Sequence, residues 1–236
     1  MLKDWIIEEK TKHPHSGIQI FTMVSDNATL KIGNTEYKIV TALPSRLNSF
    51  FMRCTKKKIP ILSSIFDYRN LIVFAPLIMK KLSRKIKKFK PDNINISSFA
   101  IAKNISLSTF HFSFFTKLYL HSPMQYIRSH YNEYCEKLTG RKGKIFKRIT
   151  PRLRKWDKKF TQFDEVYANS NYTAQLAEEL YGIKAKVKYP DVVSTDTMVC
   201  EPNSYYLYTG RLVKFVKEVD KIIHLFNQNK EPLIIM

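Results

Sequence analysis

Short apolar runs alternate with longer amphipathic segments along the chain, and this alternation constrains the fold more than any other feature. Runs typical of strands occupy residues 18–24, 36–41, 94–98, 118–120, 165–169, 187–189, 205–209 and 233–236. Helical patterns occupy residues 1–12, 45–58, 66–90, 123–137, 151–161, 171–181 and 217–228, with Gly182 placed to close the helix over 171–181. Strands that alternate with helices predict an α/β fold with parallel sheets.

The charge of the chain favours an anionic partner. Forty Lys and Arg residues against 20 Asp and Glu residues give a net charge of +20, which attracts phosphate, nucleic acid or an acidic membrane surface. The densest stretch lies between Lys137 and Lys159, which holds eleven basic residues and a single acid, Asp157. The basic clusters fall on predicted helix ends and loops.

The remaining composition argues against several classes of protein. The three cysteines, Cys54, Cys135 and Cys200, form no CxxC pair and approach no histidine at zinc-finger spacing. We therefore expect reduced thiols and no metal. The chain starts with an amphipathic segment that contains acids, unlike a secretory signal, and no run reaches about 18 uncharged apolar residues. These features predict a cytoplasmic protein, with peripheral attachment to the inner face of the plasma membrane as the form of any membrane contact.

Residues 118–127, LYLHSPMQYI, form the strongest candidate site. An apolar run ends at His121, and a helical pattern follows Pro123, which suits a first helical turn. Ligands of doubly wound sheets bind where the carboxyl ends of strands meet helix starts, and histidine can donate, accept or bind a proton there. We expect Ser122 to cap the following helix.

A second strand-to-helix turn carries Asn169 and Ser170. Side-chain oxygens and helix N–H groups at such a turn can hold a polar ligand. A simple N-cap explains the same residues equally well. Asn169 ends the strand, so it is the better candidate for facing a cleft.

Several segments together resemble one family of enzymes. They are, in chain order, 96–103 (ISSFAIAK), 121–127 (HSPMQYI) with Tyr131 and Tyr134, Trp156-Asp157, 165–173 (EVYANSNYT), Tyr181-Gly182, 189–192 (YPDV) and 208–213 (YTGRLV). This order and spacing resemble bacterial family 4 (group 1) retaining glycosyltransferases of the GT-B fold. The resemblance implies two Rossmann-like domains that transfer a sugar from a nucleotide-sugar donor to a lipid-linked or saccharide acceptor, typically in cell-surface polysaccharide biosynthesis.

The resemblance also implies roles for particular residues. His121 would line the cleft at the reacting sugar, where it positions groups and stabilises charge, and Asn169 and Ser170 would contact substrate. Arg211 would neutralise the departing diphosphate as a catalytic residue, since a guanidinium fork fits phosphate oxygens. Gly210 would permit the turn before it. A second donor-phosphate lysine would be Lys217, with Lys214 as the competing candidate. No metal or other cofactor is implied.

The resemblance further implies an incomplete enzyme. Residues 1–190 would form the acceptor-side domain without its first strand, residues 191–203 a linker, and residues 204–236 the strand–helix–strand start of the donor-side domain. In such a sheet the first strand is central, so its loss leaves unpaired edges on both sides, which are an aggregation hazard. We expect a fragment that is inactive alone, so its status as an enzyme stays open.

Two other functions compete with this one. A basic nucleic-acid-binding protein would use the same positive charge, but no RNP, KH or zinc motif is present, which makes a nucleic-acid partner the weaker interpretation. A non-catalytic subunit of a membrane glycan-assembly complex is the third interpretation.

Overall fold

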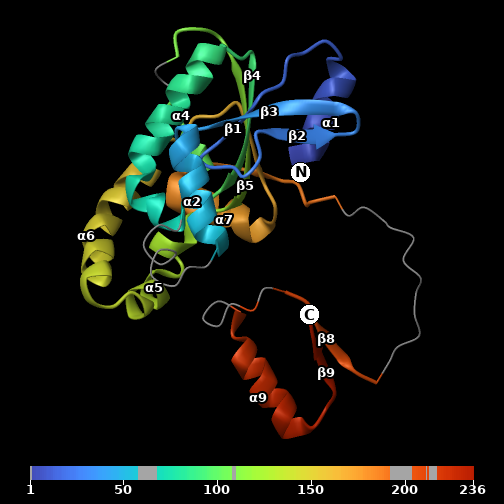
Figure 1. Cartoon of the computed structure of the whole chain (residues 1–236), viewed down its shortest axis with the longest axis vertical. Helices are drawn as coiled ribbons and strands as arrows, with labels where there is room; N and C mark the ends of the chain where they lie inside the picture. The colour runs from blue at the N-terminus through green and yellow to red at the C-terminus, as the bar shows by residue number, and fades with distance from the viewer. Residues whose placement is uncertain (1, 58–67, 108–109, 192–203, 211, 213–216) are drawn as a thin grey trace. The chain divides into compact units, whose positions relative to one another are not determined.

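The computed structural model describes residues 2–57, 68–107, 110–191, 204–210, 212 and 217–236. The chain divides into two compact units, Met1–Asp191 and Val192–Met236, each of which is described by itself (Figure 1). Most of the predicted 191–203 linker lies outside the described residues. Within the described parts, no helix combines the length and apolar character needed to cross a membrane.

The first unit is built on a four-stranded parallel sheet. Its strands are β4 (Asn93–Phe99), β5 (Phe115–Ser122), β6 (Glu165–Ala168) and β7 (Lys186–Val187), in the order β4-β5-β6-β7. Each neighbouring pair is parallel. The predicted α/β fold with a parallel sheet is therefore confirmed, and its general character is Rossmann-like.

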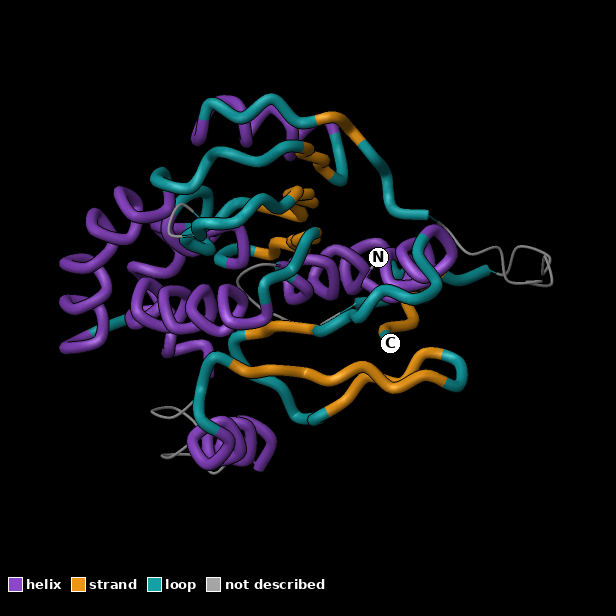
Figure 2. The backbone as a smooth tube through the Cα atoms, turned by 90° about the horizontal axis from the view of Figure 1, so that it is seen from above, coloured by secondary structure: helices purple, strands orange, loops and turns teal. Residues whose placement is uncertain are grey.

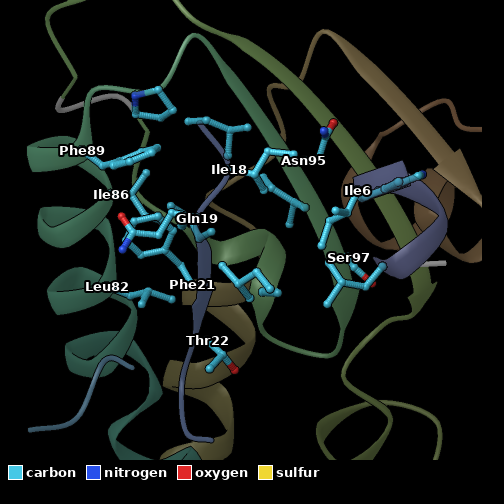
Figure 3. A pocket seen from close by; sticks show the side chains of 18 of the residues that line it. Ile6, Ile18, Gln19, Phe21, Thr22, Leu82, Ile86, Phe89, Asn95 and Ser97 are labelled. Carbon is cyan, nitrogen blue, oxygen red and sulfur yellow. The ribbon is translucent and has the colours of Figure 1, made fainter. Parts of the chain in front are cut away.

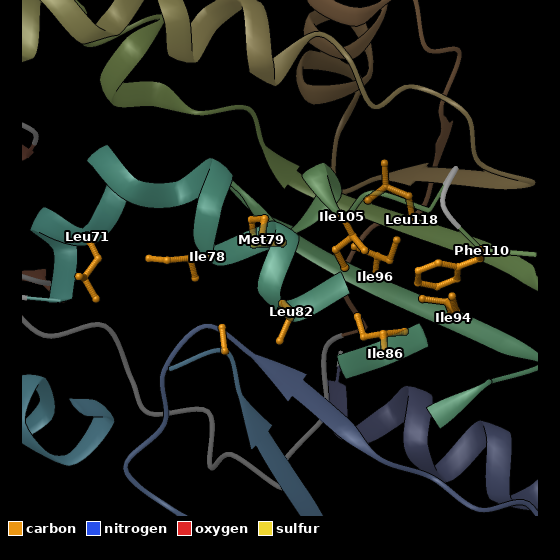
Figure 4. Close-up of a cluster of buried hydrophobic side chains, with 11 residues drawn as sticks. Leu71, Ile78, Met79, Leu82, Ile86, Ile94, Ile96, Ile105, Phe110 and Leu118 are labelled. Atoms are coloured by element: carbon orange, nitrogen blue, oxygen red, sulfur yellow. The ribbon is translucent and has the colours of Figure 1, made fainter. Parts of the chain in front are cut away.

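Helices cover both faces of this sheet. Ile94, Ile96 and Leu118 point to one face, where they form a core with α4 (Ala75–Phe89), as Figure 4 shows. Farther along the same face, Leu120 packs with residues of α7 (Asn171–Tyr181). The opposite face carries Tyr119, which meets Trp5 of α1 (Leu2–Lys12) edge to face at 6.0 Å.

A second, smaller sheet of the first unit contains β1 (Ile20–Thr22), β2 (Thr29–Ile32) and β3 (Thr35–Thr41), in the order β1-β3-β2. β1 runs parallel to β3, and β2 and β3 form an antiparallel hairpin. β2 was not predicted; it is a four-residue strand that ends at a turn with Gly33 at a φ of +56°. The prediction of a buried strand over 18–24 was partly wrong, because β1 is shorter and only half-buried.

The connections contain α2 (Ser45–Lys57), η1 (Tyr68–Phe74), η2 (Ala102–Asn104), η3 (Gln125–Ile127), α5 (Tyr131–Lys137) and α6 (Gly140–Asp157). The predicted continuous helix over 123–137 is wrong, because Arg128 leaves the helical region at φ −123° and ψ −103° and divides it into η3 and α5. The predicted helix over 151–161 is correct over 151–157, the second half of α6, but the helix ends at Asp157. The first half of α6 was not predicted, because it contains Gly143, and glycine normally argues against a helix interior. A side chain at this position would collide with the carbonyl group of Leu138.

The second unit is a strand–helix–strand element. It consists of β8 (Tyr206–Tyr208), α9 (Val219–Asn229) and β9 (Leu233–Ile235), with β8 parallel to β9. Tyr206 and Phe226 pack edge to face at 5.1 Å between strand and helix. Leu207, Leu225 and Ile234 stay exposed, as expected of an element with too few residues to build a core on its own.

A buried ionic network connects η2, α6 and α7. The carboxylate of Asp157, fully buried, lies 3.2 Å from Nζ of Lys103, which is equally buried. It also accepts hydrogen bonds from Asn104 Nδ2 at 3.1 Å and from the hydroxyl of Tyr181 at 2.7 Å. Arg128 contributes a guanidinium at 3.3 Å. Four groups from three segments, of which η2 supplies two, therefore converge on one carboxylate.

Burial lowers the pKa of Lys103, and the carboxylate of Asp157 opposes this shift. The ammonium group of Lys103 also lies 4.0 Å from the ring centroid of Tyr181, a favourable cation–π distance. The lysine thus stays compatible with a buried position only while its partners are in place.

Asp157→Asn is expected to lower the free energy of unfolding by about 3–5 kcal/mol, because it leaves the buried ammonium of Lys103 without its counter-charge. Urea unfolding measures the change. Glu136→Gln, the matched loss of charge at an exposed position of α5, should stay within about 0.5 kcal/mol of wild type. The double variant Lys103→Met, Asp157→Leu should unfold later than Asp157→Leu alone. Equal stabilities of Asp157→Asn and Glu136→Gln would contradict the role of the network.

Candidate functional site

The carboxyl ends of β5 and β6 meet at one edge of the sheet, and His121, Asn169 and Ser170 lie there. The backbone N–H of Asn169 donates to the carbonyl of Leu120 at 3.3 Å. The hydroxyl of Thr173 lies 3.5 Å from the carbonyl oxygen of His121. The structure therefore brings together the three site residues predicted in the first unit, at the end of the sheet where the parallel-strand rule expects a ligand.

His121 is held on the face of the sheet that α1 covers. Its Nε2 lies 2.9 Å from the hydroxyl oxygen of Ser97, one strand away on β4. Its ring meets the ring of Tyr119 edge to face at 4.9 Å, and the hydroxyl of Tyr119 donates to the carbonyl of Lys188 at 2.8 Å. Burial lowers the pKa of His121, so the imidazole is mainly neutral at pH 7 and suited to hydrogen bonding.

Ser170 is the N-cap of α7. Its hydroxyl accepts a hydrogen bond from the backbone N–H of Thr173 at 3.1 Å, which satisfies one of the free donors of the first turn. The same hydroxyl lies 3.3 Å from Oδ1 of Asn169. The N-cap interpretation of Ser170 is therefore confirmed, and half-buried Asn169 stays available at the end of its strand. Gly182 closes the helix at a φ of +68°, as predicted.

The prediction that Ser122 caps a helix is wrong. Its hydroxyl is buried and has no hydrogen-bond partner, and the short η3 begins after Met124 without a side-chain cap. Among the described residues, the buried side-chain atoms without such a partner are this hydroxyl, the hydroxyl of Tyr126 and Nε of Arg128. All three belong to the segment of seven residues that follows His121 in the sequence.

The end of β4 contributes a strained residue to the same edge. Ala100 adopts a φ of +80°, and its N–H lies 3.4 Å from the carbonyl oxygen of Ser122. A residue with a Cβ rarely occupies this region, and such conformations collect at functional sites. The end of β4 therefore lies at the candidate site together with the ends of β5 and β6.

The residues that the resemblance assigns to donor binding fall in the second unit. Gly210 follows β8, and its N–H donates to the carbonyl of Met236 at 3.2 Å. It lacks a left-handed φ, and a side chain there would crowd the ring of Tyr208; the close contact, rather than a special turn, explains the glycine. Lys217 is exposed. Arg211 and the competing Lys214 lie outside the described residues.

Ser97, Lys103 and Asp157 were not predicted as functional or structural centres. Asp157 had a signal in the sequence, as the single acid among eleven basic residues. Ser97 and Lys103 lie in one of the segments that resemble the family, but their contacts could not be predicted, because their partners are 24 and 54 residues away. Such contacts follow only from the register of β4 against β5 and from the packing of η2 against α6.

The described residues contain no group of three His, Cys, Asp or Glu side chains placed to hold a metal ion. No known protein-family model matches the chain, and no curated protein is significantly similar to it.

The unfolding free energy should fall as the pH drops below about 6.5, because the unfolded chain then takes up a proton at His121 before the folded chain does. This contribution is fully present above that pH. His121→Gln should remove it, and His15→Gln, at an exposed position, should keep it. Urea unfolding from pH 5 to 7.5 tests the slope, and an NMR titration of the imidazole tests its cause. A midpoint for His121 at or above 6.5 would contradict the lowered pKa.

Proposed function

We propose that the chain provides the acceptor-side domain, and the first part of the donor-side domain, of a retaining glycosyltransferase of the GT-B kind. The observation that carries the proposal is that His121 and Asn169 lie side by side at the carboxyl ends of the adjacent parallel strands β5 and β6. The segments that resemble the family include both residues. The strand–helix–strand element of the second unit supports the proposal, because such elements bind nucleotides in many α/β folds.

The chemistry assigns different tasks to the two units. In the first unit, the neutral imidazole of His121 and the carboxamide of Asn169 would orient the acceptor and the reacting sugar through hydrogen bonds. In the second unit, Arg211 and Lys217 would bind the diphosphate of the donor. The acceptor oxygen bonds to the anomeric carbon as the nucleoside diphosphate leaves with the bonding electrons. The proton of the acceptor hydroxyl passes to the departing phosphate oxygen, and positive side chains stabilise the charge that develops there.

Nucleoside diphosphates provide the direct test. Calorimetric titration with UDP, GDP and dTDP should detect binding of at least one, and Arg211→Ala should weaken it about 10- to 100-fold through loss of charged hydrogen bonds. Lys184→Ala, an exposed change of equal charge in the first unit, should leave the affinity unchanged. Absence of binding to all three nucleotides would refute the proposal.

A basic stripe on α6 supports a membrane-bound acceptor. Arg141, Lys144, Arg148, Arg152 and Lys155 recur at three- and four-residue spacing on exposed positions, with exposed Ile145 among them. The single acid of α6, Asp157, is fully buried, so no negative charge on this helix opposes the stripe. Basic residues beside apolar ones favour an anionic lipid surface as partner.

The triple variant Lys144→Gln, Arg148→Gln, Arg152→Gln should weaken binding to phosphatidylglycerol vesicles about 100-fold, since each basic residue near the surface contributes about 1 kcal/mol. Co-sedimentation measures the loss. The control triple Lys31→Gln, Lys38→Gln, Lys184→Gln removes equal charge at exposed positions of other elements and should change binding much less. Equal losses in both triples would contradict a specific stripe. Binding to single-stranded RNA but not to vesicles would favour the nucleic-acid interpretation instead.

A further inference from the structure

A β-bulge sets His121 apart from the rest of β5. The register of β4 and β5 pairs Ser98 with Leu120 and then Phe99 with Ser122, so His121 is an extra residue without a partner on β4. Bulges are rare in parallel sheets, and beside functional sites they re-aim a side chain. The bulge therefore marks the orientation of the His121 side chain as a specific feature of this strand end.

The imidazole of His121 reaches back along the sheet to the neighbouring strand β4. Figure 2 shows the strands of the larger sheet nearly end-on, one beside the next. Nε2 of His121 lies 2.9 Å from the hydroxyl oxygen of Ser97, and the imidazole ring meets the ring of Tyr119 at 4.9 Å. Ser97 and Tyr119 are direct partners in the regular ladder that precedes the bulge. Two residues of that ladder thus hold the ring of the bulged residue.

The hydroxyl of Ser97 has the imidazole as its hydrogen-bond partner and makes no other hydrogen bond among the described residues. Ser97 also lines a mainly apolar cavity of about 1010 Å³, together with Ile6 of α1 and Ile18, as Figure 3 shows. Aliphatic side chains offer the hydroxyl proton no acceptor. A hydroxyl donates one hydrogen bond, so the proton of Ser97 is directed to the lone pair of Nε2 of His121.

This hydrogen bond decides which nitrogen of His121 carries the proton. Burial lowers the pKa of His121, which keeps the ring neutral at pH 7. A neutral imidazole has one N–H donor and one acceptor nitrogen, so acceptance at Nε2 places the proton on Nδ1. Within the described part of the chain Nδ1 makes no hydrogen bond. The Nδ1–H group is therefore free to donate to a ligand.

We propose that Ser97 is a positioning residue that fixes His121 as a hydrogen-bond donor through Nδ1. The ligand then presents an oxygen with a free lone pair to this nitrogen, as a sugar hydroxyl does. Asn169 directs Oδ1 toward the hydroxyl of Ser170 at 3.3 Å, which leaves its NH₂ group to donate as well. The same geometry removes His121 from the role of general base, because Ser97 occupies its lone pair. The identity of the ligand rests on the proposed function, whereas the position of the proton does not.

Heteronuclear NMR of the full chain with labelled histidines tests the proposal, because the shifts of the ring nitrogens distinguish the two neutral tautomers. At a pH of about 8 the ring is neutral, and the signal absent from His121→Gln identifies His121. The Nδ1–H form should predominate in wild type. Its ratio to the Nε2–H form should fall about 5-fold in Ser97→Ala, as the loss of one hydrogen bond predicts. Ser97→Thr, which keeps a hydroxyl, and Ser49→Ala, at an exposed position of α2, should keep the wild-type ratio.

A wild-type imidazole with its proton on Nε2 overturns the proposal. Equal tautomer ratios in folded Ser97→Ala and in wild type also overturn it, because the serine would then not direct the proton. The wild-type spectrum gives the first of these results even if Ser97→Ala fails to fold. An Nδ1–H imidazole that depends on the hydroxyl of Ser97 supports the positioning role whether or not a nucleotide binds. Failure of this inference and failure of the proposed function are thus distinguishable.

Discussion

The buried carboxylate of Asp157 is the interaction on which the arrangement of the first unit most depends. Its partners Lys103, Asn104, Arg128 and Tyr181 come from η2, from the segment that follows η3 and from α7. These segments also carry the turns that follow β4, β5 and β6. The buried charge of Asp157 thus holds η2, the segment after η3 and α7 together. Loss of one partner would be costly, because the groups that remain would be buried without a counterpart. The position of His121 relative to Asn169 follows from the pairing of β5 with β6.

The sequence predicted the elements well where one local rule decided them. The strands β4 to β6 and the helix α7, with its cap at Ser170 and its end at Gly182, follow from apolar runs and helix-end chemistry. Prediction was wrong where tertiary contacts decided the outcome. Arg128 interrupts a pattern that looks continuously helical, and Gly143 is required by a contact with Leu138 although glycine normally argues against a helix interior. Neither contact leaves a periodic trace in the sequence.

The residues of the candidate site also divide into those that could be predicted from the sequence and those that could not. His121, Asn169 and Ser170 could be predicted because strand ends in a parallel sheet converge on one edge. The role of Ser122 could not, because a serine before a helical pattern indicates a cap unless the backbone takes another course. The contact of Ser97 with His121 could be recognised only from the register of β4 and β5, which places the serine hydroxyl beside the imidazole of the neighbouring strand. Pairing across strands is the information that local patterns lack.

The network around Asp157 also has a consequence for the order in which the chain is made. Lys103 leaves the ribosome 54 residues before Asp157, which corresponds to about 3 to 10 seconds at ordinary rates of synthesis. During that interval β4 and β5 can already pair, yet the lysine has no carboxylate and must remain in water. The parallel sheet can therefore close over η2 only after α6 has emerged. The nascent first unit becomes compact only once Asp157 has been synthesised.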